Sequence, residues 1–224
     1  MMTQDLAADF LNNDYAVLRA AAPAEVARNF LSVIHGSMIR QPGGLNNFVL
    51  QEPRVNTQRG YEFYGYRLPM AMSFHWALTS RISEIVGKSL LPSFVFFRVY
   101  MKGDRLLVHS DRQSCEYALT LTLRYSDDLM WPLEIGDVSH RFEDIADDPK
   151  SDDFGDEPFS TVRLDPGDAL LYRGVNRRHA RMIPNPNRWS AHMFLFWVDA
   201  DGPFREMAFD RKTFDGAVDF PPPG

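Results

Sequence analysis

Two side chains that bind metals, His109 and Asp111, stand two positions apart in the run RLLVHSD at 105–111. This short apolar run is typical of a β-strand. Because alternate side chains of a strand point to the same face, the imidazole and the carboxylate would reach one point. Together they form two thirds of a facial triad for non-haem Fe(II). The third ligand is expected to be a histidine from a later strand.

Only one of the remaining histidines suits that role. The other five are His35, His75, His140, His179 and His192. Two of them lie in predicted helices, one lies in an acidic segment, and one lies among aromatic residues where core packing explains it. His179 differs, because it follows a glycine-bearing turn (YRGVNRRH) and opens a predicted strand 70 residues after His109. We therefore expect His179 to complete the triad.

An arginine and a serine that could bind a carboxylate follow shortly after His179 in the sequence. Arg188 comes nine residues after His179, and Ser190 follows in the tripeptide RWS. An iron oxygenase with a dicarboxylate co-substrate needs a cation for the far carboxylate, and a hydroxyl can share that contact. Arginine suits the role because its planar guanidinium donates two parallel hydrogen bonds to a carboxylate.

The ordered series His109-x-Asp111, His179 and Arg188-x-Ser190 resembles the Fe(II)/2-oxoglutarate-dependent dioxygenases. Its spacing is similar to that of the prolyl 4-hydroxylase-like branch. The taurine-dioxygenase branch typically has a longer gap between ligands and a later arginine.

Flanking runs extend the resemblance over about residues 94–200. YMKGDRLLVHSD resembles that branch's tyrosine-x-x-glycine approach to the first ligand, which makes Tyr100 a candidate hydrogen-bond donor to the co-substrate. LDPGDALLYRG resembles the family's run before the distal histidine. MWPLEI at 130–135 stands where the family usually has tryptophan-glycine-glycine-glutamate-leucine, and the glycines are absent.

The resemblance implies Fe(II) on the three ligands, with the distal carboxylate of 2-oxoglutarate on Arg188 and Ser190, assisted by Tyr100. With O2 as oxidant, such an enzyme releases succinate and CO2 while it oxidises an unactivated C–H bond, usually by hydroxylation. The carboxylate ligand Asp111 disfavours a halogenase, since those enzymes leave that position free for chloride. Desaturation and cyclisation stay open.

The sequence says less about the substrate. Five arginines crowd the segments that carry the metal ligands: Arg112, Arg173, Arg177, Arg178 and Arg181. They form either a solvated rim or a binding site for an anionic group. Arg181 is the first candidate for substrate, because it shares strand parity with His179, and Arg112 is the second. A small carboxylate-bearing molecule, such as an amino acid or a pathway intermediate, fits best.

Other functions remain in competition. A peptide or protein hydroxylase would need an open groove. A non-enzymatic jelly-roll binding module, or a cupin-like barrel that more often uses three histidines, would not need Arg188. An AlkB-like demethylase has a second arginine six residues after the first, but position 194 is Phe here. Cys115 has no convincing base nearby and is expected to be a buried strand residue.

The predicted elements match a mainly β fold with supporting α-helices and a double-stranded β-helix (jelly-roll) core. Helices are expected after Pro23 and over 71–90, the second with Trp76 as an apolar anchor. Strands are predicted at 15–19, 94–100, 105–111, 116–125, 132–135, 160–164, 168–172, 179–183 and 190–198. The predicted single domain (1–224) comprises helical support at 1–92, a catalytic core at 93–200 and a tail at 201–224.

Composition sets limits on the remaining functions. The chain has 224 residues, 45% hydrophobic residues, one cysteine and a net charge of −6. Residues 137–158 carry nine acidic and two basic side chains, so the rest of the chain is nearly balanced. We therefore expect no nucleic-acid partner. Residues 137–158 are predicted to be a solvated loop, either a lid or a surface insertion. No signal peptide or membrane span is expected, and the single cysteine favours a cytoplasmic location.

Overall fold

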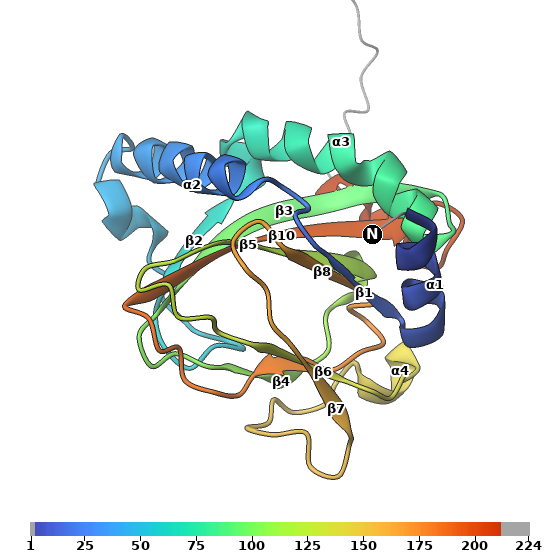
Figure 1. Ribbon diagram of the computed structural model, residues 1–224. Helices are drawn as coiled ribbons and strands as arrows, with labels where there is room; N and C mark the ends of the chain where they lie inside the picture. Colours follow the sequence, from blue (N-terminus) through green and yellow to red (C-terminus); the bar gives the residue numbers. More distant parts are fainter. Residues whose placement is uncertain (1–2, 212–224) are drawn as a thin grey trace, which may run out of the picture.

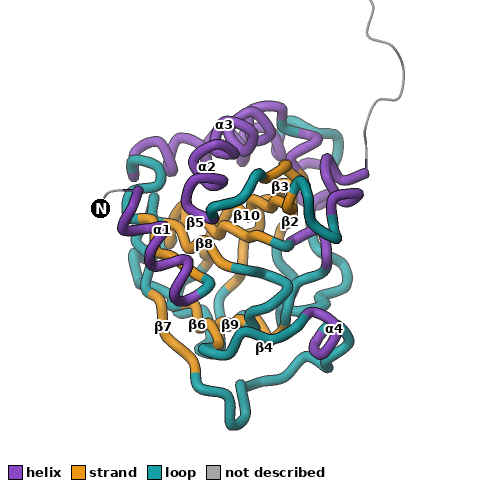
Figure 2. The backbone as a smooth tube through the Cα atoms, turned by 90° about the vertical axis from the view of Figure 1, so that its right-hand side faces the viewer, coloured by secondary structure: helices purple, strands orange, loops and turns teal. Residues whose placement is uncertain are grey.

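Two antiparallel β-sheets face each other, and helices cover the outer face of the larger sheet (Figure 1). The computed structural model describes residues 3–211. The view in Figure 2 shows the smaller sheet and its long loops on the side opposite the three longer helices. This arrangement confirms the predicted mainly β, jelly-roll architecture.

The larger sheet has the strand order β1-β8-β5-β10-β3-β2, and the smaller sheet has the order β4-β9-β6-β7. The strands of the larger sheet are β1 (Tyr15–Leu18), β2 (Tyr61–Tyr64), β3 (Leu90–Met101), β5 (Tyr117–Tyr125), β8 (Ala169–Tyr172) and β10 (Trp189–Asp199). Those of the smaller sheet are β4 (Leu106–His109), β6 (Leu133–Gly136), β7 (Phe159–Val162) and β9 (His179–Arg181).

The three longer helices cover the larger sheet, and the fourth, short helix lies beside the smaller sheet (Figure 1). They are α1 (Thr3–Asn13), α2 (Ala24–Ile39), α3 (Pro69–Val86) and the short α4 (Phe142–Ile145). Alternation along β10 explains the two cores. Met193, Leu195 and Trp197 pack beneath α2 and α3, whereas Phe194 and Phe196 point between the sheets. The space between the sheets is where chemistry-bearing side chains can converge.

The N-terminal region contributes more than support. Its strands β1 and β2 form both edges of the larger sheet. The apolar residues of 45–68 show no regular spacing, so no strand was predicted there. β2 lies in this stretch and is only four residues long, too short to give a clear alternating pattern. The predicted anchor Trp76 is 51% exposed, since the buried face of α3 is formed instead by Ala71, His75, Ile82 and Ile85.

The acidic segment 137–158 is packed against the smaller sheet and does not extend into solvent as predicted. Its Phe154 is buried against Val108 and Ala180. Its Glu157 pairs with Arg178 at 3.1 Å and with His140 at 3.2 Å. The buried side chains of Phe154 and Ile145, together with Arg178 from outside the segment, thus outweigh its low hydrophobicity. No helix in the described part of the chain is long and apolar enough to cross a membrane.

One buried histidine in α3 predicts acid sensitivity. His75 hydrogen-bonds the carbonyl of Phe196 at 2.9 Å and lies edge-on to Trp197. Burial lowers the pKa of His75 from 6.5 to about 4. Between these values the unfolded chain binds the proton and the folded chain does not, so stability falls as the pH drops through that window. The pKa difference corresponds to about 3 kcal/mol.

We therefore expect His75→Gln, which keeps an N–H donor, to lose about 3 kcal/mol less stability than the wild type when the pH is lowered from 6.5 to 4. Urea unfolding at both pH values measures the difference. Comparing the two proteins removes the shared contribution of the other buried histidines. Equal losses in the two proteins would contradict the assignment.

Candidate metal centre

The strand pairing between β4 and β9 brings two histidines face to face. His109 ends β4, and its Cα pairs with that of His179, the first residue of β9. The two imidazole centroids are 4.3 Å apart. Asp111 follows in the next turn, where its backbone N–H donates to the carbonyl of Gly174 at 2.9 Å. Two short strands and one turn therefore position all three side chains.

The ligating atoms of these three residues converge. Asp111 Oδ1 lies 3.9 Å from His109 Nε2, and Asp111 Oδ2 lies 3.8 Å from His179 Nε2. All three ligating atoms lie within 4.8 Å of one another, and all three side chains are largely buried. The predicted triad is thus brought together as a group that can hold a metal ion.

The surroundings of the two histidines fit metal binding. Nδ1 of His109 donates to the carbonyl of Leu107 at 2.7 Å, and Nδ1 of His179 donates to that of Arg177 at 3.1 Å. These bonds require the proton on Nδ1, which leaves each Nε2 lone pair available to a metal. The Tyr172 hydroxyl donates to Nε2 of His179 at 3.3 Å and would yield this position to the metal. Asp111 Oδ2 is buried without a hydrogen-bond partner. Two imidazoles and one carboxylate are the donor set of non-haem Fe(II) sites.

Burial also adjusts the protonation of the group. It lowers the pKa of the His109 imidazole well below its usual range, and the neighbouring His179 lowers it further. It raises the pKa of Asp111, which His179 and Arg112 partly oppose. A bound cation would favour the ionised carboxylate, because it supplies the positive charge that the apolar surroundings lack.

The triad opens into a cavity of about 360 Å³ between the two sheets. Its walls include Phe94 and Phe96 of β3 and Phe194 and Phe196 of β10. Its inner recess is lined by Tyr100, Leu106, Thr120 and Leu133. A cavity of this size, with aromatic walls and converging polar groups, is typical of a small-molecule site.

One arginine that the sequence analysis missed lines this cavity directly. Arg98 shares strand parity with Tyr100, the signal by which it could have been found. It is mostly buried and pairs with Glu62 of β2, with N–O distances of 3.0 and 2.5 Å. Its positive charge therefore already has a carboxylate partner.

A second buried arginine has no such partner. Arg181 is only 1% exposed, and its Nη1 donates to the backbone carbonyls of Trp131 and Pro132. Its Nη2 has no hydrogen-bond partner, and no carboxylate lies within 4.0 Å of it among residues 3–211. A buried cation without a counterion is costly, so the position favours an anionic ligand.

Further unpaired polar groups lie on the inward face of the larger sheet. Both ring nitrogens of His192 and the hydroxyls of Thr120 and Thr122 are buried without hydrogen-bond partners. His192 lies 5.8 Å from Tyr100 between ring centroids, and the charge of Arg181 acts on it. Such groups are rarely left unsatisfied in proteins. Among these groups Thr120 lines the cavity, so its lining includes an unsatisfied hydroxyl.

The remaining predicted site residues are placed as follows. Tyr100 lines the cavity, and Ser190 is buried with its hydroxyl donating to Asn185 Oδ1 at 2.8 Å. Arg112 lies at the mouth. Arg188 is not brought to the cavity, because its side chain is 73% exposed and bonds Asp127 at 3.2 Å. It precedes β10 in a turn, where its backbone N–H is also held by Asp127.

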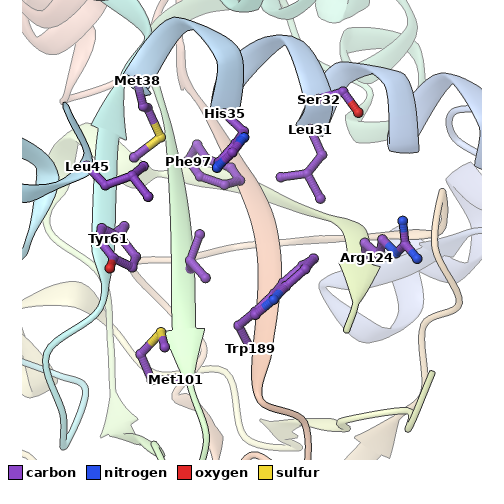
Figure 3. Close-up of a pocket in the computed structure, with 11 residues that line it drawn as sticks. Leu31, Ser32, His35, Met38, Leu45, Tyr61, Phe97, Met101, Arg124 and Trp189 are labelled. Carbon is purple, nitrogen blue, oxygen red and sulfur yellow. The ribbon is translucent and has the colours of Figure 1, made fainter. Parts of the chain in front are cut away.

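A second cavity of about 340 Å³ lies on the opposite face of the larger sheet, beneath α2 (Figure 3). Its lining is mostly apolar and includes Met38, Phe97 and Trp189, with Arg124 at one end. None of the triad residues reaches it. The metal centre is therefore associated with the inner cavity alone.

Solved structures share this fold. The epimerase SnoN, in complex with Fe3+, alpha ketoglutarate and nogalamycin RO, is similar over 99% of this chain and 93% of its own, with 14% identity and a TM-score of 0.63. HygX from Streptomyces hygroscopicus, with nickel, 2-oxoglutarate and hygromycin B bound, is similar over 89% of this chain and 88% of its own, with 13% identity and a TM-score of 0.62. A Pseudomonas putida prolyl-4-hydroxylase is similar over 88% of this chain and 99% of its own, with 10% identity and a TM-score of 0.59.

The likeness establishes the fold. No family model and no curated protein matches the sequence. Proteins of this fold are crystallised with iron or nickel and 2-oxoglutarate, and the group of His109, Asp111 and His179 can hold such a metal. The prolyl-4-hydroxylase is no more similar than the other two structures, so the prolyl 4-hydroxylase-like branch stays a prediction.

The close packing of Gly174 against Asp111 allows the metal centre to be tested. A Cβ at Gly174 would lie 2.4 Å from the carbonyl oxygen of Cys115 and 2.5 Å from Asp111 Oδ2. Gly174→Ala should therefore displace the carboxylate and weaken Ni(II) binding by about 10–100-fold, as expected for a disturbed ligand. Calorimetric titration measures the affinity, and thermal unfolding checks that the variant is folded.

Gly36→Ala in α2 is the matched control, since its added Cβ meets only the flexible side chain of Arg40. It should bind Ni(II) like the wild type. A folded Gly174→Ala variant with unchanged affinity would show that Asp111 does not hold the metal.

Proposed function

We propose that the protein is an Fe(II)- and 2-oxoglutarate-dependent oxygenase that hydroxylates a small, anionic substrate. The observation that carries the proposal is the convergence of His109, Asp111 and His179 on one point inside a jelly-roll cavity. The size of this cavity supports a small molecule over a peptide, which would need an open groove. SnoN and HygX are also solved with small molecules, nogalamycin RO and hygromycin B.

The chain's own residues would prepare the centre for oxidation. When bound, Fe(II) together with 2-oxoglutarate and O2 supplies the oxidation of an unactivated C–H bond, with release of succinate and CO2. The Nδ1 bonds of His109 and His179 fix both rings, and Asp111 contributes the negative charge. The phenylalanines of β3 and β10 keep water away from the reacting carbon.

We assign the distal carboxylate of 2-oxoglutarate to Arg181 in place of Arg188. Arg181 is buried and lacks a counterion, and one of its N–H groups is unused. It lies two residues beyond His179 on the same inward face of β9. Tyr100 and Ser190 pair across β3 and β10 at the same end of the recess. Tyr100 would supply a hydroxyl donor, whereas the Ser190 hydroxyl would have to exchange its bond to Asn185 for one to the carboxylate. Arg188, by contrast, is exposed and already pairs with the carboxylate of Asp127.

The proposed branch, reaction type and cellular location rest on the sequence. The 70-residue spacing of the two histidines supports kinship with the prolyl 4-hydroxylase-like branch. The epimerase SnoN has the same fold, so the fold alone does not specify the reaction. We propose hydroxylation because it is the usual reaction of the Fe(II)/2-oxoglutarate-dependent dioxygenases that the sequence resembles. The buried free thiol of Cys115 is compatible with the expected cytoplasmic location.

The first test is spectroscopic. Adding Fe(II) and then 2-oxoglutarate to anaerobic apoprotein should produce the weak visible charge-transfer band of the chelated complex. His109→Ala should produce none, since it removes one of three ligands. Absence of the band in folded wild-type protein would overturn the proposed function.

The second test compares the two arginines. Arg181→Lys should weaken 2-oxoglutarate binding by about tenfold or more, because lysine lacks the planar fork. The matched exposed variant Arg188→Lys should bind it like the wild type. Calorimetry with the Ni(II)-loaded proteins gives both affinities.

A ligand comparison separates this role from a general structural one. 2-Oxobutyrate lacks the distal carboxylate, so Arg181→Lys should weaken its binding far less than that of 2-oxoglutarate. Equal losses for both ligands, or a loss in Arg188→Lys instead, would refute the assignment to Arg181.

A further inference from the structure

The mouth of the inner cavity is built from stacked aromatic rings. Phe94 and Phe196 have centroids 4.6 Å apart, and those of Phe96 and Phe194 are 4.8 Å apart. The planes within these two pairs are inclined by 26° and 17°. Tyr64 continues the series from Phe96 at 5.7 Å and 29°. These near-parallel rings are one side of the path to the metal centre.

Tyr64 and Phe94 also line an adjoining cavity of about 430 Å³. Trp76 and Phe209 contribute further aromatic side chains to it, and Tyr64 itself is 37% exposed. Space along aromatic surfaces therefore continues outward beyond the mouth. A ligand longer than one ring could lie along it while its reactive end stays at the triad.

Three cations surround the same mouth. Arg54, Arg112 and Lys150 line the inner cavity and come from three separate segments. All three are exposed, and none forms an ion pair within 4.0 Å in the described range 3–211. The guanidinium carbon of Arg112 lies 4.7 Å from the ring centroid of Phe94.

This cationic mouth contrasts with the protein as a whole. The chain carries a net charge of −6, and Lys150 comes from its most acidic segment. Asp111, a proposed metal ligand, is the one acidic side chain in the cavity lining. A cleft lined by charges of one sign concentrates ligands of the opposite sign. The mouth is therefore matched to an anion.

We propose that the substrate is an aromatic anion, with a carboxylate, sulfonate or phosphate among Arg54, Arg112 and Lys150 and a flat body against Tyr64 and Phe94. A flat body suits these rings because offset and edge-to-face aromatic pairs gain stabilisation beyond their buried area. Tyr66 and Phe96 already stack on Tyr64, and Phe196 and Arg112 on Phe94, so the ligand would contact the ring edges that these neighbours leave open. Arg112 contributes twice, as counterion and as the cation stacked on Phe94. That this ligand is oxidised rests on the proposed function, whereas its binding does not.

The test uses 8-anilinonaphthalene-1-sulfonate, a fluorescent aromatic anion, with the full-length protein in the presence and absence of Ni(II) and 2-oxoglutarate. The triple variant R54Q/R112Q/K150Q should bind it at least about tenfold more weakly, given the modest contribution of each exposed charge. The uncharged analogue N-phenyl-1-naphthylamine should bind both proteins within about threefold of each other, since it contacts only the rings.

R124Q is the matched control, because Arg124 is an exposed arginine that lines the other apolar cavity beneath α2 (Figure 3). It should bind the anionic probe like the wild type. Loss of binding in R124Q but not in the triple variant would place the probe beneath α2 and overturn the proposal.

The aromatic part of the proposal is tested by competition. Octane-1-sulfonate carries the same charge without rings and should displace the probe at least about tenfold less effectively than naphthalene-1-sulfonate. Tyr64→Ala should reduce this preference. Equal displacement by the two sulfonates would overturn the aromatic assignment.

These outcomes are independent of the iron and 2-oxoglutarate chemistry. If the charge-transfer band is absent but the triple variant loses the probe, the oxygenase proposal fails and the binding site stands. If the band forms and the triple variant binds the probe like the wild type, the oxygenase proposal stands and this inference fails.

Discussion

The register between β4 and β9 is the constraint on which the rest of the structure depends. Because side chains alternate along a strand, a slip of one residue would turn His179 to the opposite face of the smaller sheet and separate it from His109. Both strands are short, so their own hydrogen bonds are few. Flanking contacts must therefore fix the register, including the pairing of β9 with β6 and the Asp111 bond to Gly174.

Sequence reasoning found the triad and the sheet architecture because both follow from local rules. Strand parity over 105–111 predicted that His109 and Asp111 share one face; in the structure β4 ends at His109, and the following turn brings Asp111 to the same point. The turn before His179 marks where the second strand begins. The helices after Pro23 and near 71–90 followed from apolar spacing and agree with α2 and α3. These features need no knowledge of which segments pack together.

Other features of the structure depend on packing between distant segments. Spacing from His179 favoured Arg188, but Asp127 from the turn after β5 holds it outside. Arg181 is buried because carbonyls around Trp131 accept its hydrogen bonds, which no local pattern reveals. In the same way, the composition of residues 137–158 predicted a solvated loop, although Phe154 finds a hydrophobic partner on β4.

The position of Lys150 within the acidic segment has a kinetic consequence. At physiological ionic strength, charges in solution act over a Debye length of about 8 Å. The net negative charge of residues 137–158 would repel an approaching anion, and this repulsion would be offset near Lys150 and the arginines that line the cavity. The segment would thus restrict the productive angles of encounter for anions, so that this one protein surface governs both how fast and from which side they arrive.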